Sequence, residues 1–264
     1  LPRAACAVAT RAARPVAARA EVVGAGGCAG TRGPGAVGIA GTGLSLGVRP
    51  RGPLTHFARD VCVPPDLRSA AETACRGRVT LVDVGRVNGH VFLNNSSLGL
   101  YPQAVRRRDE LRHGLRHGKW AASVWAAIWV LRRFPFFDVR MSVQGKIIER
   151  RTPLVFIGNN TYELDGFRIG ARKRLDAGHL SIHIIDRTDR TGLIALTARA
   201  LAGRLRQARD FETLYATHIE LTTHKGHATV ATDGEVGRLS MPLVYDLDQR
   251  SRSVIVPGTA EAEP

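Results

Sequence analysis

Two carboxylates near the C-terminal end of the sequence could take part in acid–base chemistry. Asp233 and Glu235 flank a glycine in the segment Asp233-Gly234-Glu235. A carboxylate held at the end of a strand can accept a proton from a hydroxyl group that comes within hydrogen-bonding distance. An Asp-Gly pair is also typical of a two-residue hairpin turn. From the triplet alone a plain turn is the simpler interpretation, so a catalytic role depends on the residues around it.

A second segment, residues 106–137, carries residues suited to binding an anionic surface. All three tryptophans, Trp120, Trp125 and Trp129, lie in one short apolar stretch that arginines and lysines flank. Trp at a membrane boundary places its ring among the headgroups, and neighbouring Arg and Lys attract anionic lipids. The stretch spans only about 18 Å as a helix, too short to cross a bilayer. We therefore predict an interfacial element. A helix packed on the protein core is the alternative.

The charge of the chain favours anionic partners. The formal net charge is +15 and the sequence pI is near 11.0, which suits nucleotide phosphates, nucleic acid or an anionic membrane. An Arg-rich composition without functional meaning is the alternative. No base-reading module accompanies the charge, so we expect no nucleic-acid partner.

Short strands separated by turns must position these residues. Gln144-Gly145 predicts a hairpin between two of the strands. Residues Leu67 to Cys75 predict a helix, and apolar residues at steps of three and four from Ile194 to Leu205 predict an amphipathic helix with a basic face. Many short strands at close spacing favour an antiparallel sandwich. The predicted strands are Val79–Val84, Val91–Asn94, Val139–Val143, Lys146–Glu149, Leu154–Ile157, Leu180–Ile185, Tyr215–Leu221, His227–Thr232 and Val254–Val256.

Several phrases in this strand-rich part carry a family resemblance. They are His56-Phe57-Ala58-Arg59-Asp60, Asp83-Val84-Gly85-Arg86-Val87-Asn88-Gly89, Phe92-Leu93-Asn94-Asn95-Ser96-Ser97-Leu98-Gly99, Phe156-Ile157-Gly158-Asn159-Asn160, Arg174-Leu175-Asp176-Ala177-Gly178 and Asp233-Gly234-Glu235. In this order and at these intervals they resemble bacterial diacylglycerol kinase-like proteins of the diacylglycerol kinase and sphingosine kinase superfamily. This family also resembles NAD kinases in its Gly-rich loop and neighbouring sandwich, but the phrase that begins at Phe92 points to the lipid branch.

The resemblance implies a fold and an activity. It implies an α+β chain, in which part of an α/β nucleotide-binding domain precedes a C-terminal antiparallel β-sandwich and the active site lies between them. It further implies transfer of the ATP γ-phosphate to a lipid hydroxyl with Mg²⁺, with Glu235 as the general base and Asp233 assisting. Asp176 lies where the family has an acidic loop that supports magnesium, although Ala177 stands at the second acidic position.

The nucleotide side departs from the family pattern. The family has Gly-Gly-Asp-Gly-Thr, and the nearest match is Gly26-Gly27-Cys28-Ala29-Gly30-Thr31, which has one more residue and no Asp. A second family loop, Pro-Leu-Gly-Thr-x-Asn, is replaced by Pro50-Arg51-Gly52-Pro53-Leu54-Thr55, and Pro53 lacks an amide donor. Bare glycine backbone can approach phosphate oxygens closely. The residues expected near the nucleotide are Gly26, Gly27, Gly30, Thr31, Gly52 and Thr55.

These observations lead to one main hypothesis and one alternative. We expect an ATP-dependent kinase of a diacylglycerol-like or long-chain lipid alcohol, cytoplasmic and peripherally bound to the inner membrane face, because no secretory signal opens the sequence. The alternative is a catalytically inactive, membrane-associated binding protein that keeps the sandwich. A homodimer is retained as one form of assembly. The predicted segments are an Ala/Arg-rich stretch (1–23), a remnant of the nucleotide domain (24–78), the sandwich (79–257) and a tail (258–264).

Overall fold

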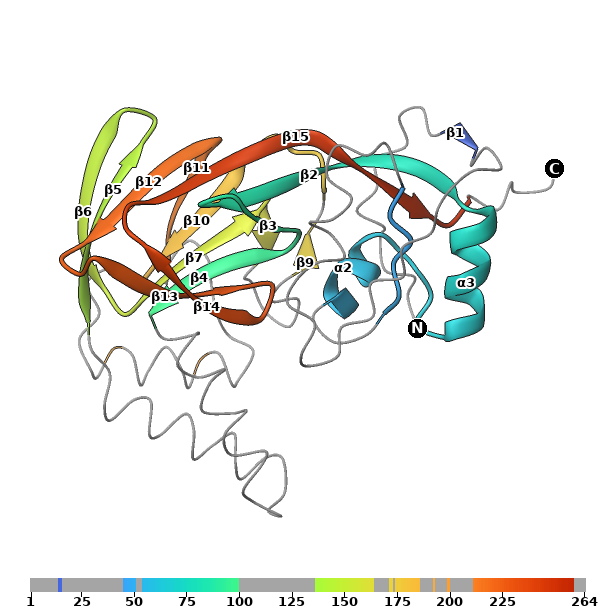
Figure 1. Ribbon diagram of the computed structural model, residues 1–264, viewed down its shortest axis with the longest axis horizontal. Helices are drawn as coiled ribbons and strands as arrows, with labels where there is room; N and C mark the ends of the chain where they lie inside the picture. The colour runs from blue at the N-terminus through green and yellow to red at the C-terminus, as the bar shows by residue number, and fades with distance from the viewer. Residues whose placement is uncertain are drawn as a thin grey trace, which may run out of the picture.

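The computed structural model describes residues 14–15, 45–50, 54–99, 136–163, 171–172, 174–185, 192, 199 and 211–258. Most of them form antiparallel strands, and two helices precede the main strands (Figure 1). The elements are β1 (Arg14–Pro15), α2 (Leu54–Asp60), α3 (Leu67–Arg76), β2 (Arg78–Val87), β3 (His90–Phe92), β4 (Asn95–Gly99), β5 (Phe137–Val143), β6 (Lys146–Thr152), β7 (Leu154–Asn159), β8 (Tyr162–Glu163), β9 (Ala171–Arg172), β10 (Leu180–Ile184), β11 (Glu212–Ala216), β12 (His218–Thr223), β13 (His227–Thr232), β14 (Glu235–Ser240) and β15 (Leu243–Val256).

Two large sheets make up the sandwich. The first has the order β1-β2-β15-β12-β5-β6, with β3 beside β2, and the second has the order β11-β10-β7-β4-β13-β14. Leu180, Ile182 and Ile184 alternate along β10 and are fully buried in the main apolar cluster, as the two-residue period of a strand requires. The predicted C-terminal antiparallel sandwich is therefore confirmed.

The strands β2 and β15 run beyond the sandwich and carry a second apolar cluster with α2 and α3 (Figure 1). Val84 and Val254 on these strands are buried in it together with Phe57 of α2. Asp66 caps α3, because its carboxylate accepts the backbone N–H of Ser69 at 2.8 Å and so satisfies one of the unpaired donors of the first turn. The helix predicted from Leu67 is confirmed, whereas α2 was not predicted.

In the described part of the chain, three hairpins close on two-residue turns in which both residues have positive φ. They are Asn88-Gly89, Gln144-Gly145 and Asp233-Gly234. Positive φ at both positions is the requirement of the type I′ turn, which matches the twist of the flanking strands. The hairpin predicted at Gln144-Gly145 is confirmed, with Val143 paired to Lys146.

One predicted strand was wrong, and several others were shorter than the strands observed. The run Tyr215–Leu221 is two strands, because β11 pairs with β10 in the second sheet while β12 pairs with β15 and β5 in the first. The chain crosses between the sheets at Thr217, where the apolar pattern gives no sign of a break. The predicted strand Val254–Val256 is the end of the longer β15. The amphipathic helix expected between Ile194 and Leu205 lies outside the described residues apart from residue 199, and the domain boundary at residue 78 stays a prediction.

Candidate functional site

The turn Asp233-Gly234 joins β13 to β14 at the end of the sandwich that faces α2 (Figure 1). The φ angles of its two residues are +49° and +83°, and Thr232 pairs with Glu235 across the turn. The tight turn suggested by the triplet is therefore present. It makes Glu235 the first residue of β14.

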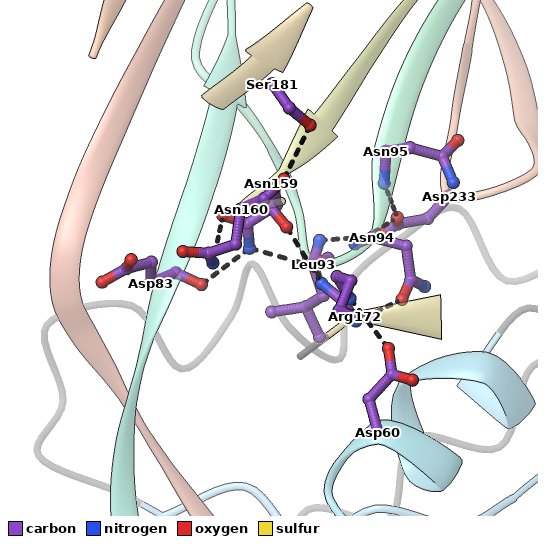
Figure 2. Close-up of polar contacts among 10 residues, drawn as sticks. All are labelled: Asp60, Asp83, Leu93, Asn94, Asn95, Asn159, Asn160, Arg172, Ser181 and Asp233. Atoms are coloured by element: carbon purple, nitrogen blue, oxygen red, sulfur yellow. Dashed lines mark hydrogen bonds and ion pairs between the residues drawn. The ribbon is translucent and has the colours of Figure 1, made fainter. Parts of the chain in front are cut away.

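The carboxylate of Asp233 is bound by backbone amides of the connection between β3 and β4. Its Oδ2 accepts the N–H of Leu93 at 2.7 Å, and its Oδ1 accepts the N–H groups of Asn94 at 2.8 Å and Asn95 at 3.1 Å (Figure 2). The Asp233 amide in turn donates to the Asn95 carbonyl at 2.9 Å. Asp233 thus anchors the turn to residues 93–95, which we call the 93–95 segment.

Two opposing effects act on the Asp233 carboxyl group. Burial raises its pKa above the usual value, and the three amide donors and the charge of Arg172 offset this rise only in part. Hydrogen bonds to an ionised acceptor are stronger than those to a neutral one. The turn is therefore held most firmly when Asp233 carries its charge.

Glu235 differs from Asp233 in its surroundings. Its residue is exposed, and β14 is the outermost strand of the second sheet. The backbone of Glu235 is held by its pairing with Thr232 and by the anchored turn. The site therefore combines a firmly held backbone with an exposed residue that carries a carboxylate.

Arg172, which no sequence pattern indicated, places a buried guanidinium against the 93–95 segment. Arg172 on β9 donates through Nε to Asp60 Oδ2 at 2.8 Å, through Nη1 to the Leu93 carbonyl at 2.7 Å and through Nη2 to Asn94 Oδ1 at 2.9 Å (Figure 2). The side chains of Arg172 and Asp60 are 0% and 4% exposed. Asp60 and Asn94 stood in the phrases that carry the family resemblance, but Arg172 stood in a basic run without any such signal.

Asn159 and Asp83 connect the neighbouring loops to the 93–95 segment by hydrogen bonds. The Asn159 amide donates to the carbonyls of Asp83 at 2.8 Å and Leu93 at 3.0 Å. The Asp83 carboxylate accepts the backbone N–H groups of Gly178 and Arg250, both at 2.8 Å. Buried polar groups with satisfied hydrogen bonds rigidify their surroundings, so the ends of several strands are fixed relative to one another.

The contacts of Asp176 do not fit a magnesium ligand. Its carboxylate pairs with Arg174 at 3.0 Å and with Arg250 at 3.5 Å, and the hydrogen bond from Arg174 is the main cause that lowers its pKa. Mg²⁺ requires oxygen ligands in near-octahedral order, and two guanidinium groups occupy this carboxylate instead. Among the described residues, no group of three or more His, Cys, Asp or Glu could hold a metal ion.

The other predicted binding residues are only partly within the described structure. Thr55 is exposed in the first turn of α2. The segment 106–135, which includes the three tryptophans, lies outside the described residues, and so do Gly26, Gly27, Gly30, Thr31 and Gly52. In the part that the structure does describe, no helix is long and apolar enough to pass through a membrane.

Comparison with solved structures finds a similar fold in two proteins of Bacillus anthracis. A protein of Bacillus anthracis strain Sterne described as a candidate diacylglycerol kinase matches with a TM-score of 0.63 and 26% identity, over 81% of this chain and 70% of that one. A diacylglycerol kinase of the same strain matches with a TM-score of 0.55 and 21% identity, over 81% and 67% of the two chains.

Sequence comparison agrees with the structural one. A diacylglycerol kinase of Staphylococcus aureus (strain JH9) is 25% identical over 145 residues, which are 54% of this chain and 45% of that protein. The match therefore spans less than half the length of this relative. The model of the "YegS C-terminal NAD kinase beta sandwich-like domain" matches residues 97–256, the part that contains most of the sandwich. The chain therefore belongs to this family, within the diacylglycerol kinase-like lipid kinases.

Proposed function

We propose that this chain transfers the γ-phosphate of ATP to the hydroxyl group of a diacylglycerol-like or long-chain lipid alcohol, with Glu235 as the general base. The observation that carries the proposal is an exposed carboxylate beside an anchored turn, in a chain of the diacylglycerol kinase-like family. A general base needs an accessible carboxylate whose position is fixed relative to the substrate. Glu235 meets the first condition by its exposure and the second through its backbone.

In the proposed reaction, Glu235 accepts the proton of the lipid hydroxyl as its oxygen attacks the γ-phosphorus. The new bond joins the lipid oxygen to phosphorus, and the bond between phosphorus and the leaving ADP oxygen breaks. Asp233 assists by holding the turn rather than by taking a proton, because its carboxylate already accepts three backbone amides. Catalysis of phosphoryl transfer rests mainly on positioning and charge stabilisation, to which a fixed turn contributes directly.

The nucleotide belongs to the side of the molecule that contains α2. The residues proposed to contact it are Gly26, Gly27, Gly30, Thr31, Gly52 and Thr55, and the last two flank the start of this helix. ATP would supply the transferred phosphoryl group. The contacts of Asp176 do not fit magnesium, so we assign no step to a metal at that residue.

The lipid acceptor implies a membrane surface as the place of reaction. The segment 106–137 combines three tryptophans with flanking Arg and Lys, a composition typical of interfacial elements. We include in the proposal that this segment holds the chain on an anionic, cytoplasmic membrane face. The chain needs no spanning helix for this, since charge and interfacial aromatic rings suffice for peripheral binding.

The substitution Glu235→Gln tests the proposed base. It removes the proton acceptor and keeps the size of the side chain. We expect kcat for phosphorylation of dioctanoylglycerol by radiolabelled ATP to fall at least roughly 100-fold, the usual contribution of a general base, with KM for the lipid little changed. Glu220→Gln is the matched control, because Glu220 is also an exposed strand residue but lies on β12 of the other sheet. Equal activity of the two variants would exclude Glu235 as the base.

A nucleotide-binding measurement separates the kinase from an inactive binding protein. Wild type and the Glu235→Gln variant should both bind labelled ATP in equilibrium dialysis, because the substitution does not touch the proposed nucleotide residues. Failure of the wild-type chain to bind ATP at millimolar concentration would favour the inactive alternative. Dioctanoylglycerol binding without phosphorylation by the wild type would have the same meaning.

A further inference from the structure

Arg172 links α2 to the 93–95 segment, which holds the turn Asp233-Gly234. We propose that it is a positioning residue, which fixes the location of Glu235 through the 93–95 segment and Asp233. The inference rests on the proposed role of Glu235 as the base. It adds a residue to that site from a strand that carries no recognisable motif.

The guanidinium of Arg172 contacts several parts of the chain at once. Three of its nitrogens donate to three different parts of the chain, namely Asp60 on α2, the 93–95 segment and, at 3.3 Å, the Asn159 carbonyl at the end of β7 (Figure 2). The planar fork of Arg fixes the directions of its donors relative to one another. One side chain therefore sets the relative positions of a helix and two strand ends.

The 93–95 segment is held from both sides. The Leu93 carbonyl accepts from Arg172 at 2.7 Å and from Asn159 Nδ2 at 3.0 Å, while the Leu93 amide donates to Asp233 at 2.7 Å. Asn94 likewise accepts from Arg172 through its side chain and donates to Asp233 through its backbone. A displacement of Arg172 would therefore pass to Asp233 through continuous hydrogen bonds, and from there through the turn to Glu235, two positions along the chain.

The positive charge of the buried Arg172 is compensated by its neighbours. A buried cation is stable only if it is paired and its donors are satisfied. The Asp60 carboxylate supplies the countercharge at 2.8 Å. The rings of Phe57 and Tyr162 lie 5.7 and 5.4 Å from the guanidinium carbon, within the range of cation–π attraction. The surroundings are thus specific for a guanidinium, which a lysine cannot replace at more than one or two of its contacts.

The test compares Arg172→Lys with Arg174→Lys in the full chain. Arg172→Lys retains a positive charge beside Asp60 but loses the fork that reaches Leu93 and Asn94. Arg174 is a nearby arginine that is 58% exposed and pairs with Asp176, two positions along the chain. Three quantities are measured: kcat and KM for dioctanoylglycerol, hydrogen exchange by NMR at the amides of Leu93, Asn94 and Asn95, and the urea midpoint of unfolding.

We expect Arg172→Lys to speed exchange at these three amides at least tenfold and to lower kcat at least tenfold, with KM changed less than threefold. Arg174→Lys should leave all three quantities near wild type. If Arg172 had a purely structural role, kcat of Arg172→Lys would instead fall only in proportion to the loss in its urea midpoint. That outcome, or unchanged exchange at the 93–95 segment, would overturn the inference.

Two further results keep the test decisive. If Arg172→Lys does not fold, Asp60→Asn replaces it, since the amide oxygen still accepts from Arg172 Nε while the countercharge is lost. Faster exchange at the 93–95 segment is expected there too, and its absence refutes the link. If Glu235→Gln stays fully active, the proposed base is wrong, whereas the exchange data still decide whether Arg172 fixes the 93–95 segment.

Discussion

Buried His183 makes the stability of the folded chain depend on pH. It lies on β10 with no exposed surface, and its Nδ1 is 3.1 Å from Thr213 Oγ1. Its Nε2 has no hydrogen-bond partner among the described residues. The rings of Phe156 and Phe211 lie 5.8 and 6.4 Å away. Burial lowers the pKa of His183 to about 4, because an apolar site disfavours the charged imidazolium.

This lowered pKa predicts a loss of stability in mild acid. The unfolded chain binds a proton at His183 near pH 6.5, whereas the folded chain does so only near pH 4. Stability is therefore complete above pH 6.5 and falls as the pH drops toward 4, by on the order of 3 kcal/mol. Urea unfolding between pH 7.5 and 4.5 should show a shallower fall for His183→Phe than for wild type. His218→Gln, a change at an exposed histidine, should keep the wild-type slope, and equal slopes for all three proteins would contradict the prediction.

Residues of the site differ in how far sequence could identify them. Asp233 and Glu235 were recognisable because turn chemistry and a family phrase coincide in a few adjacent positions. Arg172 was not, because its partner Asp60 is 112 positions away and its own neighbours form a basic run typical of a solvated surface. The anchoring role of Asp233 was also hidden, since the three amides that it accepts belong to a different hairpin.

Among the elements, the hairpin of β13 and β14 depends on glycine at one position. Gly234 has a φ of +83°, where a side chain with a Cβ is strained. Gly237 on the same hairpin has space for a Cβ, with no atom within 4 Å of it. We expect Gly234→Ala to lower the free energy of unfolding by roughly 1 kcal/mol and to reduce kcat, since the strain falls beside Glu235. Gly237→Ala should change stability by less than about 0.5 kcal/mol, and equal urea midpoints for the two variants would show that the turn tolerates a side chain.

Elements defined by local chemistry were predictable, and elements defined by distant pairing were not. The turn at Gln144-Gly145 and the helix from Leu67 follow from residues within a few positions. The crossing between the sheets at Thr217 does not follow from nearby residues. What distinguishes β11 from β12 is that β11 pairs with β10 in one sheet and β12 pairs with β5 in the other. The length of β15 was missed for the same reason, since polar residues beside its bulge at residues 248–252 interrupt the apolar pattern while its pairing with β2 continues on both sides.

At the scale of the whole molecule, β2 and β15 join the sandwich to the part that contains α2 and α3. Val87 and Tyr245 belong to the main apolar cluster, whereas Val84 and Val254 of the same two strands belong to the second. The two clusters therefore share a continuous pair of strands, and the Asp60–Arg172 ion pair adds a buried polar connection between the same two parts. These connections fix the position of α2 relative to the turn Asp233-Gly234.

The net charge of +15 makes the proposed membrane association testable. If the segment 106–137 lies on an anionic surface, binding should be electrostatic and weaken with salt, because the Debye length falls from about 10 Å at 0.1 M to roughly 4 Å at 0.5 M. We expect sedimentation with vesicles of 30% phosphatidylglycerol at low salt, little with neutral phosphatidylcholine, and release at 0.5 M NaCl. Replacing Arg106, Arg107 and Arg108 by Ser should weaken binding markedly, since each basic residue near the surface contributes about 1 kcal/mol. Replacing Arg140, Arg150 and Arg151 by Ser removes the same charge from the hairpin of β5 and β6. Equal losses of binding in the two triple variants would mean that net charge alone, rather than the segment 106–137, brings the chain to the membrane.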